Sequence, residues 1–111
     1  MIAAFRVDAD ASADEWMRSH ATEEPRVIAY DVKRCCGGGK LCMVRVREHS
    51  RKDDTRDYAT AVLADGTMLK VDRRAARRLP PRFGLTVRGM GPFRRLDLEL
   101  SGEQWGALLY D

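Results

Sequence analysis

The sequence predicts an α+β domain, in which a mostly antiparallel meander sheet has an N-terminal helix, a short arginine-rich helix and a C-terminal helix packed on it. Short segments in which apolar and polar residues alternate indicate half-buried strands. Two capping patterns indicate where helices begin. The connections between strand segments are short, which favours antiparallel pairing. With 111 residues the chain has room for one core, so residues 1–111 are expected to form a single domain.

The N-terminal segment is expected to form a strand over residues 2–7 and then a helix. Ser12 and Glu15 have the spacing of a capping box, in which Ser12 is the N-cap. Helical spacing then directs one apolar stripe towards the sheet, so Trp16 is expected to be buried. The stripe consists of Ala13, Trp16, Met17 and His20.

A hairpin is predicted next, because two alternating segments that begin at Arg26 and Leu41 are separated by three consecutive glycines. A register with Val46 opposite Val32 keeps the valines on one face of the sheet. The same register places Cys42 opposite Cys36.

The chain is then expected to continue as a charged loop over residues 50–57 and a second hairpin. The strands of this hairpin are residues 58–63 and 68–71. Between them lies the dipeptide Asp65-Gly66, which favours a tight primed turn.

The C-terminal part is expected to contain strands over residues 85–88 and 93–100, followed by a helix. Ser101 and Gln104 form the second capping box. The helical spacing after Ser101 directs Trp105 inward, so this second tryptophan is also expected to be buried.

The charge of the chain is unevenly distributed. The net charge is +3, yet residues 1–24 carry a net −4 and residues 45–95 a net +8. Sixteen of the 20 basic residues are arginine, a bias that a G+C-rich bacterial genome would also produce.

The sequence shows no signal-peptide pattern, no apolar run of membrane-spanning length and an odd number of cysteines. We therefore expect a cytoplasmic protein with no membrane association.

The basic half suggests a binding surface. Asp72 is predicted to cap a short helix over residues 73–79, which Pro80 ends. Its arginines share one side, and such a surface suits the phosphates of a nucleic acid or an acidic protein partner. Only Phe83 and Phe93 are candidates for base stacking. The predicted contacts are Arg73, Arg74, Arg77, Arg78, Arg82, Arg88, Arg94 and Arg95.

The cysteine-glycine turn supports an alternative function. Cys35, Cys36 and Cys42 are potential thiolate ligands for zinc or partners in redox chemistry. Adjacent cysteines on a strand point to opposite faces, and His49 lies too far from Cys42 along an extended strand to share a metal. Small buried thiols without a ligand are therefore the expected state, with no cofactor.

Two further alternatives remain at the level of sequence. The amides of Gly37, Gly38 and Gly39 together with Lys40 could bind an anion as a nest. A structural subunit without a ligand, for example a homodimer that pairs exposed strand edges, is the other alternative. The chain has none of the common nucleophile, dinucleotide-binding or zinc-protease motifs, so no catalytic residue is predicted.

Overall fold

The computed structural model describes residues 4–34, 40–55 and 57–110. The strands in this part of the chain are β1 (Phe5–Ala9), β2 (Arg26–Arg34), β3 (Lys40–Arg47), β4 (Tyr58–Leu63), β5 (Met68–Asp72), β6 (Arg82–Arg88) and β7 (Arg95–Glu99). The α-helices are α1 (Ala11–Ser19), α2 (Arg73–Ala76) and α3 (Gly102–Tyr110). Short 3₁₀ turns occupy Arg51–Thr55 and Gly91–Phe93.

The strands form a mixed sheet, so the prediction of a mostly antiparallel meander with three packed helices is wrong. The sheet order is β3-β2-β5-β4-β1-β6-β7. The hairpins β2–β3, β4–β5 and β6–β7 are antiparallel, as short connections favour. However, β1 pairs in parallel with both β4 and β6, and β2 pairs in parallel with β5. A short connection determines only how the two strands that it joins pair, and these three ladders join strands that are distant in the chain.

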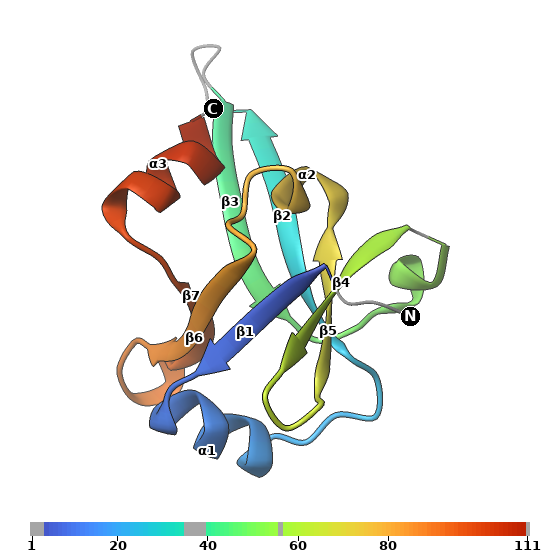
Figure 1. The fold of residues 1–111 in the computed structure, drawn as a ribbon, viewed down its shortest axis with the longest axis vertical. Coiled ribbons are helices and arrows are strands. Elements are labelled where there is room, and N and C mark those ends of the chain that lie inside the picture. Colours follow the sequence, from blue (N-terminus) through green and yellow to red (C-terminus); the bar gives the residue numbers. More distant parts are fainter. Residues whose placement is uncertain (1–3, 35–39, 56, 111) are drawn as a thin grey trace.

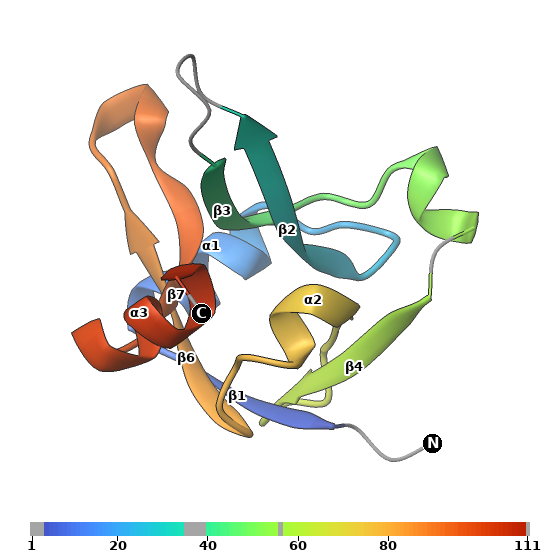
Figure 2. The ribbon, with the colours of Figure 1, turned by 90° about the horizontal axis from the view of Figure 1, so that it is seen from above.

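The sheet curls into a nearly closed barrel (Figures 1 and 2). Its two edge strands, β3 and β7, lie side by side, which brings the ends of the sheet order together. Figure 2 looks down the barrel and shows α2 across one end. Figure 1 shows α1 at the opposite end, where it packs beside β6 and β1. The helices are short, and the sheet dominates the structure.

The register of the first hairpin differs from the predicted one. Val46 lies opposite Ile28, and Val32 lies opposite Cys42. The predicted pairs, Val46 with Val32 and Cys42 with Cys36, are therefore wrong. Hydrophobic alternation has a period of two residues, so it cannot distinguish registers that differ by an even number of residues.

The start of α1 was also predicted two residues too late. The N-cap is Asp10, whose Oδ1 accepts hydrogen bonds from the backbone N–H of Ala13 at 2.9 Å and from the Ser12 hydroxyl at 2.6 Å. Ser12 is thus inside the helix and orients the true cap. Aspartate and serine are both favoured N-caps, so residue type could not separate the two positions.

The other two helix starts confirm the sequence patterns. Asp72 caps α2 by accepting from the backbone N–H of Arg74 at 2.9 Å. At α3, the Ser101 hydroxyl accepts from the Gln104 backbone at 3.1 Å, and the Gln104 side chain accepts from the Ser101 backbone at 2.9 Å. The reciprocal pair is the predicted capping box. However, the α-helical part of α2 ends at Ala76, earlier than expected.

The β4–β5 turn is a hairpin turn but not a primed one. The N–H of Leu63 donates to the carbonyl of Thr67 at 2.8 Å, which leaves a three-residue loop. Gly66 has φ +88°, whereas no described residue other than glycine, Asp65 included, has a positive φ. A type I′ turn needs two positive φ values, so the loop belongs to the three-residue class.

The core lies inside the barrel and is built from strand residues such as Val7, Ile28, Leu69, Leu85 and Leu98, all at most 2% exposed. The helices α1, α2 and α3 add Ala13, Ala75 and Leu108. Trp16 and Trp105 pack against this core but are only half-buried. No helix in the described residues is long and apolar enough to cross a membrane.

Candidate nucleic-acid interface and neighbouring cavities

The structure divides seven of the eight predicted arginines into two groups at opposite ends of β6. Arg73, Arg74, Arg77 and Arg78 form the α2 cluster, on the helix and turn that cross one end of the barrel. Arg88, Arg94 and Arg95 belong to the β6–β7 tip, residues 88–95, at the other end (Figure 1). The strand from Arg82 to Arg88 separates them by about 20 Å at roughly 3.3 Å per residue. The eight side chains therefore do not form one continuous patch.

In the α2 cluster, two arginines support the fold and the other two are more available for contact with a ligand. Arg74 donates to the carboxylate of Asp72 at 3.2 Å and to the Tyr30 carbonyl at 2.7 Å. The hydrogen bond with Asp72 raises the pKa of Arg74. Arg78 lies over the Tyr30 ring at 5.3 Å. Arg73 forms an exposed ion pair with Asp57 at 3.0 Å, and Arg77 is exposed with no side-chain partner among the described residues.

Arg82, the eighth predicted arginine, belongs to neither group and lies at the α2 end of β6. It begins β6 and pairs with Asp8 on the neighbouring strand β1, with an Nη2–Oδ1 distance of 3.0 Å. Both side chains are largely exposed. The hydrogen bond from Arg82 lowers the pKa of Asp8. An exposed pair of this kind contributes little to stability, so Arg82 can exchange Asp8 for another anion at small cost.

The β6–β7 tip presents large apolar side chains to solvent. Phe93 is 78% exposed and Met90 84% exposed, whereas Phe83, the other aromatic candidate, is in the core. Arg94 lies over the ring of Trp16 at 5.9 Å, and Arg88 pairs with Asp97 at 3.1 Å. Phe93 is therefore next to Arg94 in the chain, on the same tip as Arg88 and Arg95.

The tip has a defined conformation. Gly89 has φ +96°, and a Cβ at this position would lie 2.2 Å from the Phe93 carbonyl oxygen. Gly91 also has a positive φ, +57°. The N–H of Phe93 donates to the Met90 carbonyl at 3.0 Å. These constraints fix the backbone that carries Phe93 outward.

A buried ion pair that the sequence did not suggest lies in the β3–β4 connection. The Asp53 side chain is fully buried, and its two oxygens accept from the two terminal nitrogens of Arg47, each at 2.7 Å. The Ser50 backbone N–H and the Tyr58 hydroxyl also donate to it. These hydrogen bonds, the one from Arg47 above all, hold the pKa of Asp53 far below its usual range. The network fixes the connection as a structural element.

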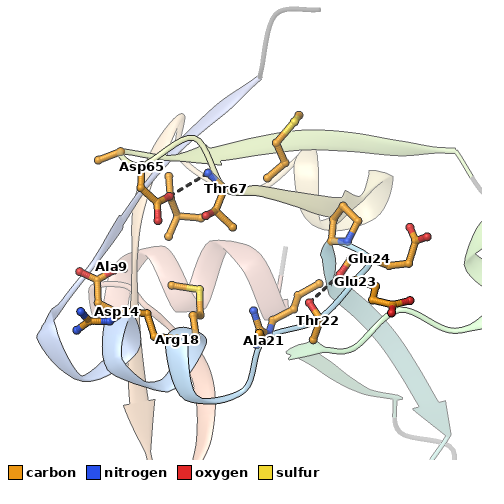
Figure 3. Close-up of a pocket in the computed structure, with 15 residues that line it drawn as sticks. Ala9, Asp14, Arg18, Ala21, Thr22, Glu23, Glu24, Asp65 and Thr67 are labelled. Atoms are coloured by element: carbon orange, nitrogen blue, oxygen red, sulfur yellow. Dashed lines mark hydrogen bonds between the residues drawn. The ribbon is translucent and has the colours of Figure 1, made fainter.

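A cavity of about 610 Å³ is acidic (Figure 3). It lies between α1, the segment before β2 and the β4–β5 turn. In Figure 3, Asp65 and Thr67 face Asp14 and Arg18 across it. Its volume is typical of small-molecule sites. Its four lining carboxylates, those of Asp14, Glu23, Glu24 and Asp65, outnumber the two lining arginines, Arg18 and Arg26, which makes it unsuitable for a polyanion.

The cysteine-glycine turn is only partly covered by the structure. Cys35, Cys36, Gly37, Gly38 and Gly39 lie outside the described residues. Lys40 and Cys42 are in β3, where Lys40 pairs with Arg34 and Cys42 with Val32.

A metal site finds no support in the described part of the chain. His49 forms a hydrogen bond with Asp54 at 2.8 Å, at the far end of β3 from Cys42. No group of three or more potential metal-ligating side chains occurs among the residues that the structure covers.

Comparison with models of protein families, with curated proteins and with solved structures finds no match for this chain.

Proposed function

We propose that the protein binds nucleic acid, with the β6–β7 tip as the site of base contact. The observation that carries the proposal is the exposure of Phe93, at 78%, on a fixed loop between Arg88 and Arg94. An exposed aromatic ring can stack on an unpaired base, and neighbouring guanidinium groups can neutralise the phosphates. Exposed apolar side chains on a constrained loop are typical of binding surfaces.

The α2 cluster supplies a second, electrostatic part of the proposed interface. Among the described residues, Arg77 is exposed without a side-chain partner and Arg73 is held by an exposed ion pair, which phosphate can replace. Arg74 is excluded from this role because it supports the fold through Asp72 and Tyr30. A nucleic-acid strand that contacts both the α2 cluster and the β6–β7 tip would follow β6 for about 20 Å.

The test is the binding of a labelled single-stranded oligonucleotide, measured by fluorescence anisotropy at increasing salt concentrations. The series begins at about 50 mM salt, because phosphate contacts are strongest at low salt. We expect Phe93→Ala to weaken binding by about 1–3 kcal/mol through lost stacking, with the salt slope unchanged because the ring is uncharged. Arg94→Ala is expected to flatten the logarithmic salt slope by about 0.7. The double variant Arg73→Ala/Arg77→Ala should flatten the salt slope by about 0.7 for each phosphate contact that is lost.

Met90→Ala is the matched control, since Met90 is equally exposed on the same loop but cannot stack as an aromatic ring does. Affinity that falls equally in Met90→Ala and Phe93→Ala would contradict the stacking role. Wild-type protein that does not bind oligonucleotide at about 50 mM salt would overturn the proposal. If it instead binds polyglutamate in a salt-sensitive way, the partner is an acidic protein.

A further inference from the structure

A small cavity of about 140 Å³ lies where the barrel does not close, between the end of β3 and the start of β7. We call it the seam cavity. Its polar lining comes from four elements that meet there. The side chains concerned are those of Trp16, His20, Arg26, Arg47, Glu48 and Arg95.

Arg26 is the unusual member of this lining. It lies on the same face of β2 as Ile28 and Tyr30, both of which belong to the core, and it is only 7% exposed. Its guanidinium donates to the carbonyl of His20. This is its one side-chain hydrogen bond in the described part of the chain, where it has no ion-pair partner. A guanidinium has five N–H donors, so most of its capacity is unused.

Arg26 lines two cavities, the seam cavity and the acidic cavity. Among the described residues, the one fully buried side-chain atom without a hydrogen-bond partner is Nδ1 of His49. The remaining nitrogens of Arg26 are therefore not fully buried without a partner, and the seam cavity is one of the two spaces that Arg26 lines. Burial lowers the pKa of Arg26, an effect that the charge of Glu48 partly offsets. An anion in the cavity would stabilise this buried charge.

The charge balance of the lining also favours an anion. Arg47 is already neutralised by Asp53 through two hydrogen bonds at 2.7 Å. Arg26 and Arg95 then face the single carboxylate of Glu48, which leaves one positive charge in excess. The indole of Trp16 stacks on His20 at 4.0 Å and forms a rigid wall.

We propose that the seam cavity binds a phosphate group through Arg26 and Arg95. A water molecule takes about 30 Å³ of liquid, so the cavity holds roughly four or five waters or one tetrahedral oxyanion. The planar fork of arginine binds two oxygens of such an anion at once. The site shares Arg95 with the β6–β7 tip but goes beyond the proposed nucleic-acid function, because it does not need Phe93 or the α2 cluster.

The experiment is a titration with inorganic phosphate at constant ionic strength in a Trp105→Phe background, which leaves Trp16 as the single tryptophan. We expect a saturable change in emission with a Kd of about 1 mM or lower. Arg26→Met should weaken binding at least about tenfold, as the loss of a charge-assisted hydrogen bond implies. Arg26→Lys should bind with intermediate affinity, since it keeps the charge but loses the fork.

Two further variants keep the test decisive if Arg26→Met does not fold. Glu48→Gln removes the one carboxylate of the lining and should tighten phosphate binding. Arg18→Gln, an exposed residue of the acidic cavity, is the matched control and should bind as wild type. An absence of saturable binding, or equal affinity in wild type, Arg26→Lys and Glu48→Gln, would overturn the proposal.

The source of the phosphate group is decided by competition. An oligonucleotide with a terminal phosphate that displaces inorganic phosphate, when its unphosphorylated form does not, assigns the site to a nucleic-acid end. If neither form displaces it, the ligand is the free anion. Phe93→Ala should keep phosphate binding in both cases, so failure of the tip and failure of the seam site are distinguishable.

Discussion

Of the three buried charged residues among those described, Arg26 and Asp53 are the two that sequence reasoning missed. In the sequence, Arg26 looks like the polar start of a strand, and Asp53 like one of several charges in a solvated loop. Their burial depends on contacts made elsewhere in the fold: Arg26 lies at the barrel seam, and Asp53 meets Arg47 and Tyr58 from two strands. Charged residues are rarely buried unless paired, so a local pattern favours exposure.

For Asp53, we expect the substitution Asp53→Asn to destabilise the protein by about 3 kcal/mol, because it leaves the charge of Arg47 without its buried partner. Urea unfolding at neutral pH measures the loss. Asp54→Asn is the matched control, since Asp54 is the exposed neighbour that contacts His49. A loss in Asp54→Asn as large as in Asp53→Asn would contradict the assignment.

The same carboxylate predicts an acid dependence of stability. The folded-state pKa of Asp53 is lowered, so its contribution is fully present well above the unfolded-state pKa of about 3.9 and is lost progressively as the pH falls through that value towards the lowered folded-state pKa. Wild-type stability should therefore fall more steeply on acidification than that of Asp53→Asn. Parallel pH profiles of the free energy of unfolding would count against this cause.

At the scale of elements, the sequence correctly predicted features that depend on neighbouring residues, such as strand bounds and helix caps. The strand over residues 58–63 has the expected bounds, and Asp72 and Ser101 cap their helices as predicted. Errors arose where two positions offered the same chemistry. Asp10 and Ser12 are both good N-caps, and period-two alternation permits several hairpin registers.

The β6–β7 tip is an element whose shape rests on Gly89. We expect Gly89→Ala to destabilise the tip, because φ +96° is unfavourable for alanine and the added Cβ would clash with the Phe93 carbonyl. The loss should exceed the roughly 1–2 kcal/mol of the backbone term alone. Gly91→Ala is the control, since it has a positive φ but open space around it. Urea unfolding and oligonucleotide binding should both rank Gly89→Ala as the more severe change.

At the scale of the whole molecule, the parallel ladders could not be predicted from the chain. β1 is followed by α1, yet its partners are β4 and β6, which come more than 50 residues later. Nothing in the composition of residues 5–9 specifies these partners, because the pairing depends on how three hairpins fit together around a shared core. Likewise, the split of the arginines into two groups follows from the direction of β6 across the barrel.

This topology predicts a gradient of backbone protection across the sheet. β1, β4 and β5 have hydrogen-bonded neighbours on both sides, whereas β3 and β7 are the edges. Amide groups in the centre can open only when the sheet is disrupted, so their exchange should report global unfolding. Amides of β3 and β7 have a free side at the seam and should exchange through smaller openings.

Native-state hydrogen exchange in increasing denaturant measures both kinds of opening. We expect the exchange of β1 amides to depend steeply on denaturant and that of β7 amides to depend on it only weakly. Equal protection and equal slopes in β1, β3 and β7 would mean that the edges are joined in solution and the barrel is closed, which would also remove the seam cavity.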